Sequence, residues 1–91
     1  MQNDSQNVSK KLVLAAAKIV KKYRLLTGKS IYTISAESGI PTSTWQDFEN
    51  AKYKNVNLKI LWKISEGLEV PIEKLIAEIR QGLGEDFTLI E

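Results

Sequence analysis

The side chains of this chain that could do chemistry are its eleven carboxylates, its thirteen Lys and Arg, and its amides and hydroxyls, because it has no cysteine and no histidine. Their absence removes disulfides, thiolate nucleophiles, imidazole bases and the usual zinc ligands. Carboxylates can hold magnesium or run acid–base chemistry, but here they are scattered, with no tight pair in a glycine-rich or apolar setting. We therefore expect no catalytic site, no metal and no cofactor.

Basic side chains are concentrated in the first two thirds of the chain. Up to Lys63 there are eleven Lys and Arg against four acids, whereas from Ile64 onward there are two against seven. Such a distribution has two interpretations, a solvated face that keeps the protein in solution, or a basic face for a polyanion with a separate acidic end. Charge alone leaves both open, so the choice depends on the elements that hold these side chains.

Length and hydropathy bound the class of protein. Ninety-one residues fit one domain, since a single core organises about 100 to 150 residues. No apolar run approaches the roughly 18 residues of a membrane-spanning helix. The segment Met1 to Asn7 is polar and lacks the basic-then-apolar order of a secretion signal. We expect a water-soluble, cytoplasmic, all-helical protein without a membrane partner.

Apolar spacing predicts a long first helix. It follows Ser9 as N-cap and ends at Thr27 and Gly28, because glycine accepts the conformation that closes a helix. Its inward positions are three or four residues apart, as one helix face requires; they are Leu12, Ala16, Ile19, Tyr23 and Leu26.

Two short helices follow, separated by Gly39. Ser30 is a candidate cap for a helix over residues 31–38 that buries Ile34. After Ile40 and Pro41 a helix over about residues 42–50 is expected, and its inward residues are Trp45 and Phe48. Neither helix could bury its apolar face alone, so the two form an angular pair that other helices cover.

Two more helices and a tail complete the prediction. A polar, basic loop over residues 51–56 leads to a fourth helix, which Asn57 caps and whose inward residues are Leu58, Leu61, Ile64, Ser65 and Leu68. Pro71 then starts a fifth helix over about residues 72–81, with Gly82 ending it and with Ile72, Leu75, Ile76 and Ile79 on one face.

The C-terminal segment after Gly82 contains the β-prone run Phe87-Thr88-Leu89-Ile90. Terminal residues commonly fray. The alternative is a dimer-forming arm or strand, because four consecutive apolar or β-branched residues are poorly explained as free coil. Both interpretations stay open from the sequence.

The stretch SIYTISAESGIPTSTWQDFEN, followed by the basic loop and NLKILWKISEGLEVPIEKL, resembles the five-helix DNA-binding domain of the Cro and phage-repressor (XRE-type) family over roughly residues 9–79. The motif that carries the likeness is an ordered set of core and turn positions, here Ile34, Ser35, Gly39, Ile40, Trp45 and Phe48. The resemblance implies a compact, lambda-repressor-like all-α domain over 9–81, with the helix-turn-helix at 31–50 and a tail at 82–91.

Family members often pair an Arg late in the first helix with a Glu at the end of the recognition helix. Arg24 and Glu49 stand at those places. The alternative is that they are two independent surface charges. Even a formed pair fixes geometry more than it stabilises, because desolvation offsets much of the attraction.

The resemblance also implies which residues contact DNA. Base-reading falls to Thr42, Ser43, Gln46 and Asp47. Their chemistry agrees, because Gln can bond adenine bidentately, hydroxyls serve donor or acceptor edges, and Asp can accept from cytosine. Each also has a bland interpretation as a helix-start residue or a surface acid. Phosphate contacts are expected from a second set, Lys29, Ser30, Asn50, Lys52, Tyr53, Lys54 and Asn55.

Some residues depart from the family pattern. Ile31 replaces the Gln that commonly contacts phosphate, Pro41 replaces a hydroxyl cap, and Ala51 replaces a frequent loop Gly. An Ala held at positive φ is strained, so the loop is expected to differ locally. The large Trp45 and the acidic Asp47 could mark a recognition face with altered or lost affinity for DNA.

The leading hypothesis is a bacterial or phage transcriptional regulator, such as a repressor, that binds double-stranded DNA as a homodimer. One alternative keeps the fold and makes the chain an antitoxin-type or accessory protein whose main partner is another protein. Another is a pure protein-interaction domain, since fold does not fix function.

Overall fold

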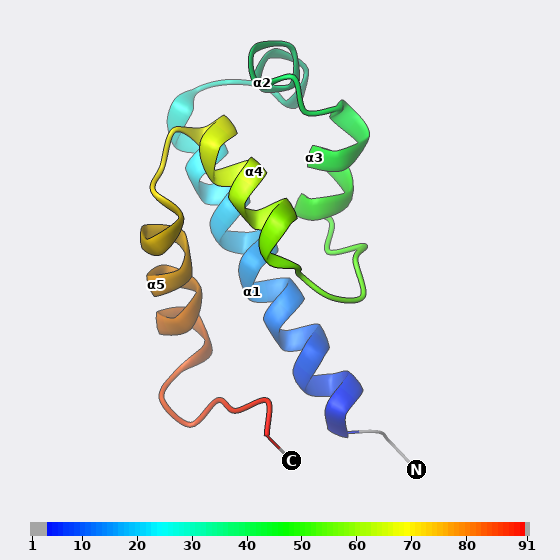
Figure 1. Cartoon of the computed structure of the whole chain (residues 1–91), viewed down its shortest axis with the longest axis vertical. Coiled ribbons are helices and arrows are strands. Elements are labelled where there is room, and N and C mark those ends of the chain that lie inside the picture. The colour runs from blue at the N-terminus through cyan, green and yellow to red at the C-terminus, as the bar shows by residue number, and fades with distance from the viewer. Residues whose placement is uncertain (1–3, 91) are drawn as a thin grey trace.

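The computed structural model describes residues 4–90 and places five helices around one core (Figure 1). They are α1 (Asp4–Thr27), α2 (Ile31–Ser38), α3 (Thr42–Glu49), α4 (Leu58–Leu68) and α5 (Ile72–Leu83). No strand is present in the part of the chain described. The expected all-helical, five-helix fold is confirmed.

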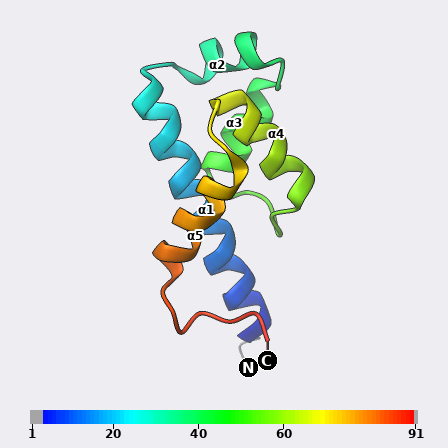
Figure 2. The same cartoon turned by 60° about the vertical axis from the view of Figure 1, so that its left-hand side comes forward.

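Helix α1 is the spine of the fold, and α3, α4 and α5 all pack on it (Figures 1 and 2). Helices α2 and α3 lie at one end of the molecule, and the start of α1 lies at the other, next to the tail that follows α5. The core between the helices is apolar; its members are Ala16, Val20, Ile34, Ile40, Trp45, Phe48, Leu61, Ile64, Leu68, Leu75 and Ile79.

Local capping signals predicted the starts of two helices correctly. The Ser30 side chain accepts a hydrogen bond from the Thr33 amide at 3.1 Å and caps α2. The Asn57 side chain accepts from the Ile60 amide at 2.8 Å and caps α4 in the same way. Such caps satisfy amides that have no partner within the helix.

The predicted start of α1 and the predicted end of α5 were wrong. Helix α1 begins at Asp4, so Ser9 lies inside the helix and is not its cap. Helix α5 runs through Gly82 and ends at Leu83, where the amide of Gly84 donates to the carbonyl of Arg80. The two errors have different causes. The polar residues before the apolar stripe of α1 carry little periodic signal for a helix. In α5, glycine is a weak stop signal, and the helix tolerates Gly82 within its last turn.

Three residues predicted to face the core are exposed. Leu26 is 71% exposed, Leu58 60% and Ile76 44%. On α1 the buried line runs instead through Val13 and Val20, beside the predicted stripe, because α3, α4 and α5 gather around that line. A predicted stripe gives the period of a helix, but its neighbours decide which flank of the stripe is covered.

The run Phe87-Thr88-Leu89-Ile90 forms no strand and does not pair with the rest of the described chain as a sheet. The tail bends back toward α1, where Asp86 and Phe87 line a shallow groove together with Lys11, Leu14, Ala15 and Lys18. Leu89 and Ile90 beyond it are 56% and 85% exposed.

Candidate nucleic-acid interface

The turn between α2 and α3 is built by Gly39 and two serines. Gly39 has φ +76°, a conformation that costs an L-residue with a side chain about 1 to 2 kcal/mol. The Ser35 hydroxyl donates to the Ile40 carbonyl at 2.6 Å, and the Ser38 hydroxyl accepts from the Ile40 amide at 3.2 Å. The side chain of Ser35 thus ties α2 to the turn that follows it.

Two aromatic side chains anchor α3. Trp45 is completely buried and Phe48 is 2% exposed. Gly67 of α4 lies against the Trp45 ring, where an added Cβ would sit 2.9 Å from Cζ2 of Trp45 and 3.2 Å from Cδ1 of Ile40. A close-packed contact of this kind leaves α3 little freedom to tilt on the core.

The opposite side of α3 faces solvent. Ser43, Gln46 and Asn50 are exposed, and Thr42 and Asp47 are half-buried. On a helix of 3.6 residues per turn these five positions share one face, away from Trp45 and Phe48. The four residues expected to read bases therefore lie together on the solvent side of α3.

The structure brings Arg24 and Glu49 together in a bidentate ion pair. Nε of Arg24 lies 2.5 Å from Oε2 of Glu49, and Nη2 donates to Oε1 at 2.9 Å. The two side chains are 10% and 5% exposed. The hydrogen bonds to Glu49 raise the pKa of Arg24 against the opposing effect of burial. Nη1 also donates to the carbonyl of Lys29 at 2.9 Å, so one guanidinium joins α1, the turn before α2 and the end of α3.

The loop after α3 presents most of its expected phosphate contacts to solvent. The amide of Lys52 donates to the Asp47 carbonyl at 2.9 Å, which closes the loop onto α3. Lys52, Lys54 and Asn55 are exposed. Tyr53 differs, because it is half-buried with its ring centroid 5.9 Å from that of Phe48. Its ring belongs to the packing of the loop on α3.

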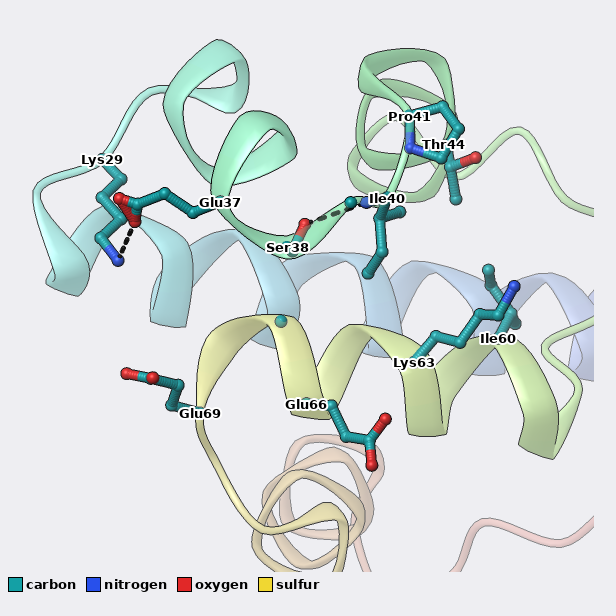
Figure 3. A pocket seen from close by; sticks show the side chains of 12 residues that line it. Lys29, Glu37, Ser38, Ile40, Pro41, Thr44, Ile60, Lys63, Glu66 and Glu69 are labelled. Atoms are coloured by element: carbon teal, nitrogen blue, oxygen red, sulfur yellow. Dashed lines mark hydrogen bonds and ion pairs between the residues drawn. The ribbon is translucent and has the colours of Figure 1, made fainter.

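Lys29 and Ser30, before α2, are already engaged by neighbours. Nζ of Lys29 lies 2.6 Å from Oε1 of Glu37, and the hydrogen bond to that carboxylate raises the pKa of Lys29. This pair lies at the edge of an open cleft of about 530 Å³ between the α2–α3 turn and α4. Figure 3 shows the side chains that line the cleft. The Ser30 hydroxyl caps α2 and contacts the Thr33 hydroxyl at 3.1 Å. Because the Thr33 amide already donates to the Ser30 side chain, the amides of Ile31 and Tyr32 are the ones left for an anion there.

Two features of this region were not predicted from the sequence. Tyr32, in the first turn of α2, is 79% exposed and stands next to the expected phosphate contacts at Lys29 and Ser30. Its exposure could have been predicted, because a residue two positions before Ile34 lies on nearly the opposite side of the helix. The pairing of Lys29 with Glu37 had none, because the two stand eight positions apart with most of α2 between them.

Comparison with known protein families assigns this chain to one of them. A family model described as helix-turn-helix (HTH_3, the XRE/Cro type) matches residues 20–75, which is more than half of the chain. The chain belongs to this family. No curated protein and no solved structure matches it significantly. Membership of the XRE/Cro-type family implies DNA binding, and such a domain is typical of regulators that are not enzymes.

This XRE/Cro-type domain accommodates its three departures from the family pattern in different ways. Ile31, which stands where Gln is common, packs half-buried against the core. Pro41 occupies the N-cap position of α3 without a side-chain hydrogen bond. Ala51 keeps the left-handed conformation, with φ +56°. The strain expected of an Ala at positive φ is therefore present at this position.

Two further properties of this helix-turn-helix protein bear on its class. None of the helices described over residues 4–90 combines the length and the apolarity that crossing a bilayer requires. Within the same residues, no three Asp, Glu, His or Cys side chains group closely enough to hold a metal ion.

Proposed function

We propose that this protein binds double-stranded DNA sequence-specifically as a transcriptional regulator, with α3 in the major groove. The observation that carries the proposal is the division of α3 into two faces. Trp45 and Phe48 fix one face to the core, and Glu49 ties its last turn to Arg24. The other face is open to solvent and polar, as a helix that reads base edges must be.

The proposed base-reading residues are Thr42, Ser43, Gln46 and Asp47. Gln46 is the strongest of them, because it is exposed and its amide can bond adenine through both donor and acceptor. Ser43 is exposed beside it and can serve either edge. Asp47 can accept from cytosine N4, and it takes part in none of the ion pairs among residues 8–90. The negative charge of Asp47 would repel phosphate oxygens. Asp47 would therefore be tolerated only opposite a base that offers it a hydrogen-bond donor.

Phosphate contacts are proposed on both sides of α3. On one side, the first-turn amides of α2 offer an anion site, with Lys29, Ser30 and the phenol of Tyr32 beside it. To contact a phosphate, the Lys29 ammonium group would have to leave its ion pair with Glu37. On the other side are the residues at the end of α3 and in the following loop, namely Asn50, Lys52, Tyr53, Lys54 and Asn55.

We further propose that the protein acts as a homodimer, as a repressor or other regulator of transcription in the cytoplasm of a bacterium or a phage-infected cell. One α3 touches few bases, whereas two copies on neighbouring half-sites add their binding free energies. A palindromic operator then mirrors the symmetry of the dimer.

A titration of labelled random-sequence duplex at several salt concentrations tests the proposal against a domain that binds only proteins. DNA binding predicts saturation at low salt and a steep fall in affinity as salt rises, because each phosphate contact releases counterions. Absence of saturable binding at low salt would contradict DNA binding and favour the protein-interaction alternative.

A further inference from the structure

The side of α1 that faces solvent carries lysines and leucines that neither the core nor the proposed DNA-binding face uses. We propose that this side is a docking surface for an acidic, apolar segment of a partner protein. This α1 outer face consists of five residues that are all exposed, namely Lys11, Leu14, Lys18, Lys21 and Leu25. Docking there does not depend on DNA binding by α3.

The spacing of the α1 outer face makes it one continuous surface. Its residues follow one another at steps of three or four, and such positions line up along a helix. Ala16 and Val20 lie on the opposite side of α1, where they are buried beneath the rest of the fold. The α1 outer face is therefore held toward solvent by the packing of the core.

The lysines of the α1 outer face carry positive charge that the described side chains do not neutralise. Their neighbour Lys22 is paired with Glu78 at 2.7 Å. Lys11, Lys18 and Lys21 take part in none of the ion pairs among residues 8–90. Three like charges within about 15 Å along one helix favour an anionic partner, because a partner of opposite charge relieves their mutual repulsion.

Apolar surface lies between these charges. Leu14 is 49% exposed and Leu25 is 59% exposed. A shallow groove of about 550 Å³ lies between α1 and the C-terminal tail, and its apolar lining residues are Leu14, Ala15, Leu83 and Phe87. A phosphate backbone cannot bury such side chains, whereas a protein segment with apolar residues can. The mixture of lysine and leucine therefore favours a protein partner over a nucleic acid.

The C-terminal tail shows which chemistry fits this surface. Asp86 and Phe87 line the groove together with Lys11 and Lys18, toward the end of the molecule that lies away from α2 (Figures 1 and 2). An acid and an aromatic side chain thus already lie beside the lysines. Asp86 forms no ion pair among residues 8–90, so the tail is a loosely held occupant. The C-terminal half of the α1 outer face does not line this groove and stays open to a longer acidic segment.

Fluorescence anisotropy of a labelled peptide, added to the full chain without DNA, tests the docking. The probe is a synthetic peptide with the sequence of residues 85–91, which carries three acids and three large apolar residues. Asp86→Lys combined with Phe87→Ser removes the tethered competitor from the full chain. This tail variant should bind the peptide at least roughly threefold more tightly than the wild type does, because a tethered tail acts at a high effective concentration.

Charge reversal on α1 tests the lysines. Lys11→Glu with Lys18→Glu, added to the tail variant, should weaken peptide binding roughly tenfold or more, because two attractions become two repulsions. Lys59→Glu with Lys63→Glu on α4 is the control for the same change of net charge and should have a clearly smaller effect. If the α1 variant lost its helical circular dichroism, Lys11→Gln with Lys18→Gln replaces it. Binding roughly threefold weaker is then expected, and unchanged binding would contradict the proposal.

A second peptide, in which serine replaces Phe, Leu and Ile at unchanged charge, tests the apolar part. It should bind roughly fivefold or more weakly than the first, since it buries less apolar surface. The proposal would be overturned by equal binding of the two peptides, by a tail variant no tighter than the wild type, or by no saturable binding up to about 1 mM.

Random-sequence duplex DNA added to the bound peptide separates a protein partner from a nucleic acid. The proposal predicts that the peptide stays bound, so the anisotropy is unchanged or rises. Release of the peptide would assign the α1 outer face to nucleic acid and overturn the proposal. Because the peptide titrations contain no DNA, their failure is distinct from failure of DNA binding by α3.

Discussion

Arg24 of α1 and Glu49 of α3 meet through two hydrogen bonds in a largely buried position at the end of α3. The same guanidinium holds the Lys29 carbonyl, where the chain turns toward α2. The pair therefore sets how far the recognition helix and the start of α2 stand from the spine of the fold.

Removal of one partner of this pair should be costly. Arg24→Ala leaves the Glu49 carboxylate buried without its cation, and Glu49→Ala leaves the guanidinium alone. Each change should lower the free energy of unfolding by about 3 kcal/mol or more. The double variant should lose clearly less than the sum of the two in a denaturant-unfolding cycle. Additive losses would show that the two side chains act independently.

The strained loop residue gives a prediction of opposite sign. Ala51 has φ +56°, so Ala51→Gly should raise the free energy of unfolding by about 1 kcal/mol, net of the greater freedom of glycine in the unfolded chain. Ala36→Gly is the matched control on an exposed, regular helix and should lower it by about 0.5 to 1 kcal/mol. Equal losses at the two positions would mean that Ala51 is not strained.

The contact of α4 with the recognition helix depends on Gly67. Gly67→Ala adds a Cβ 2.9 Å from the Trp45 ring and should lower the free energy of unfolding by about 1 to 3 kcal/mol. Gly82→Ala in α5 meets nothing within 4 Å and should instead stabilise the helix by about 0.5 to 1 kcal/mol. Thermal or denaturant unfolding of the two variants measures the difference. A stabilising Gly67→Ala would contradict the close packing of α3 on α4.

Substitution of a base-reading residue and substitution of a phosphate-contacting residue should change DNA binding in different ways. On a selected site, Gln46→Ala should change the preferred base at one position in each half-site and cost about 1 to 3 kcal/mol there. Lys54→Ala should weaken all sequences alike and reduce the salt slope by about one for each subunit. Binding measured on a panel of single-base variants separates the two effects. An unchanged base preference in Gln46→Ala would mean that α3 docks in another register.

Features governed by neighbouring residues could be predicted from the sequence. The caps at Ser30 and Asn57 and the turn at Gly39 depend on a side chain and the few backbone groups beside it, so their residue types were sufficient. The solvent face of α3 followed in the same way, by setting aside Trp45 and Phe48 as core.

Features governed by distant residues could not be predicted from local patterns alone, and the Arg24–Glu49 pair was expected only from the family resemblance. Whether Leu58 and Ile76 are covered depends on how α4 and α5 rotate on α1, and their apolar spacing fits either outcome. Likewise, Lys29 looks like a free phosphate contact until the fold brings Glu37 to it. The helical start of α1 carries too few apolar residues for a stripe to mark it.

Selection of bound sequences from random duplex DNA by the full chain tests the central claim most directly. The account predicts enrichment of a two-fold symmetric site whose half-site centres are about 34 Å apart or a multiple of that distance. Recovery of no enriched site, with equally weak binding to every duplex, would contradict sequence-specific recognition by α3.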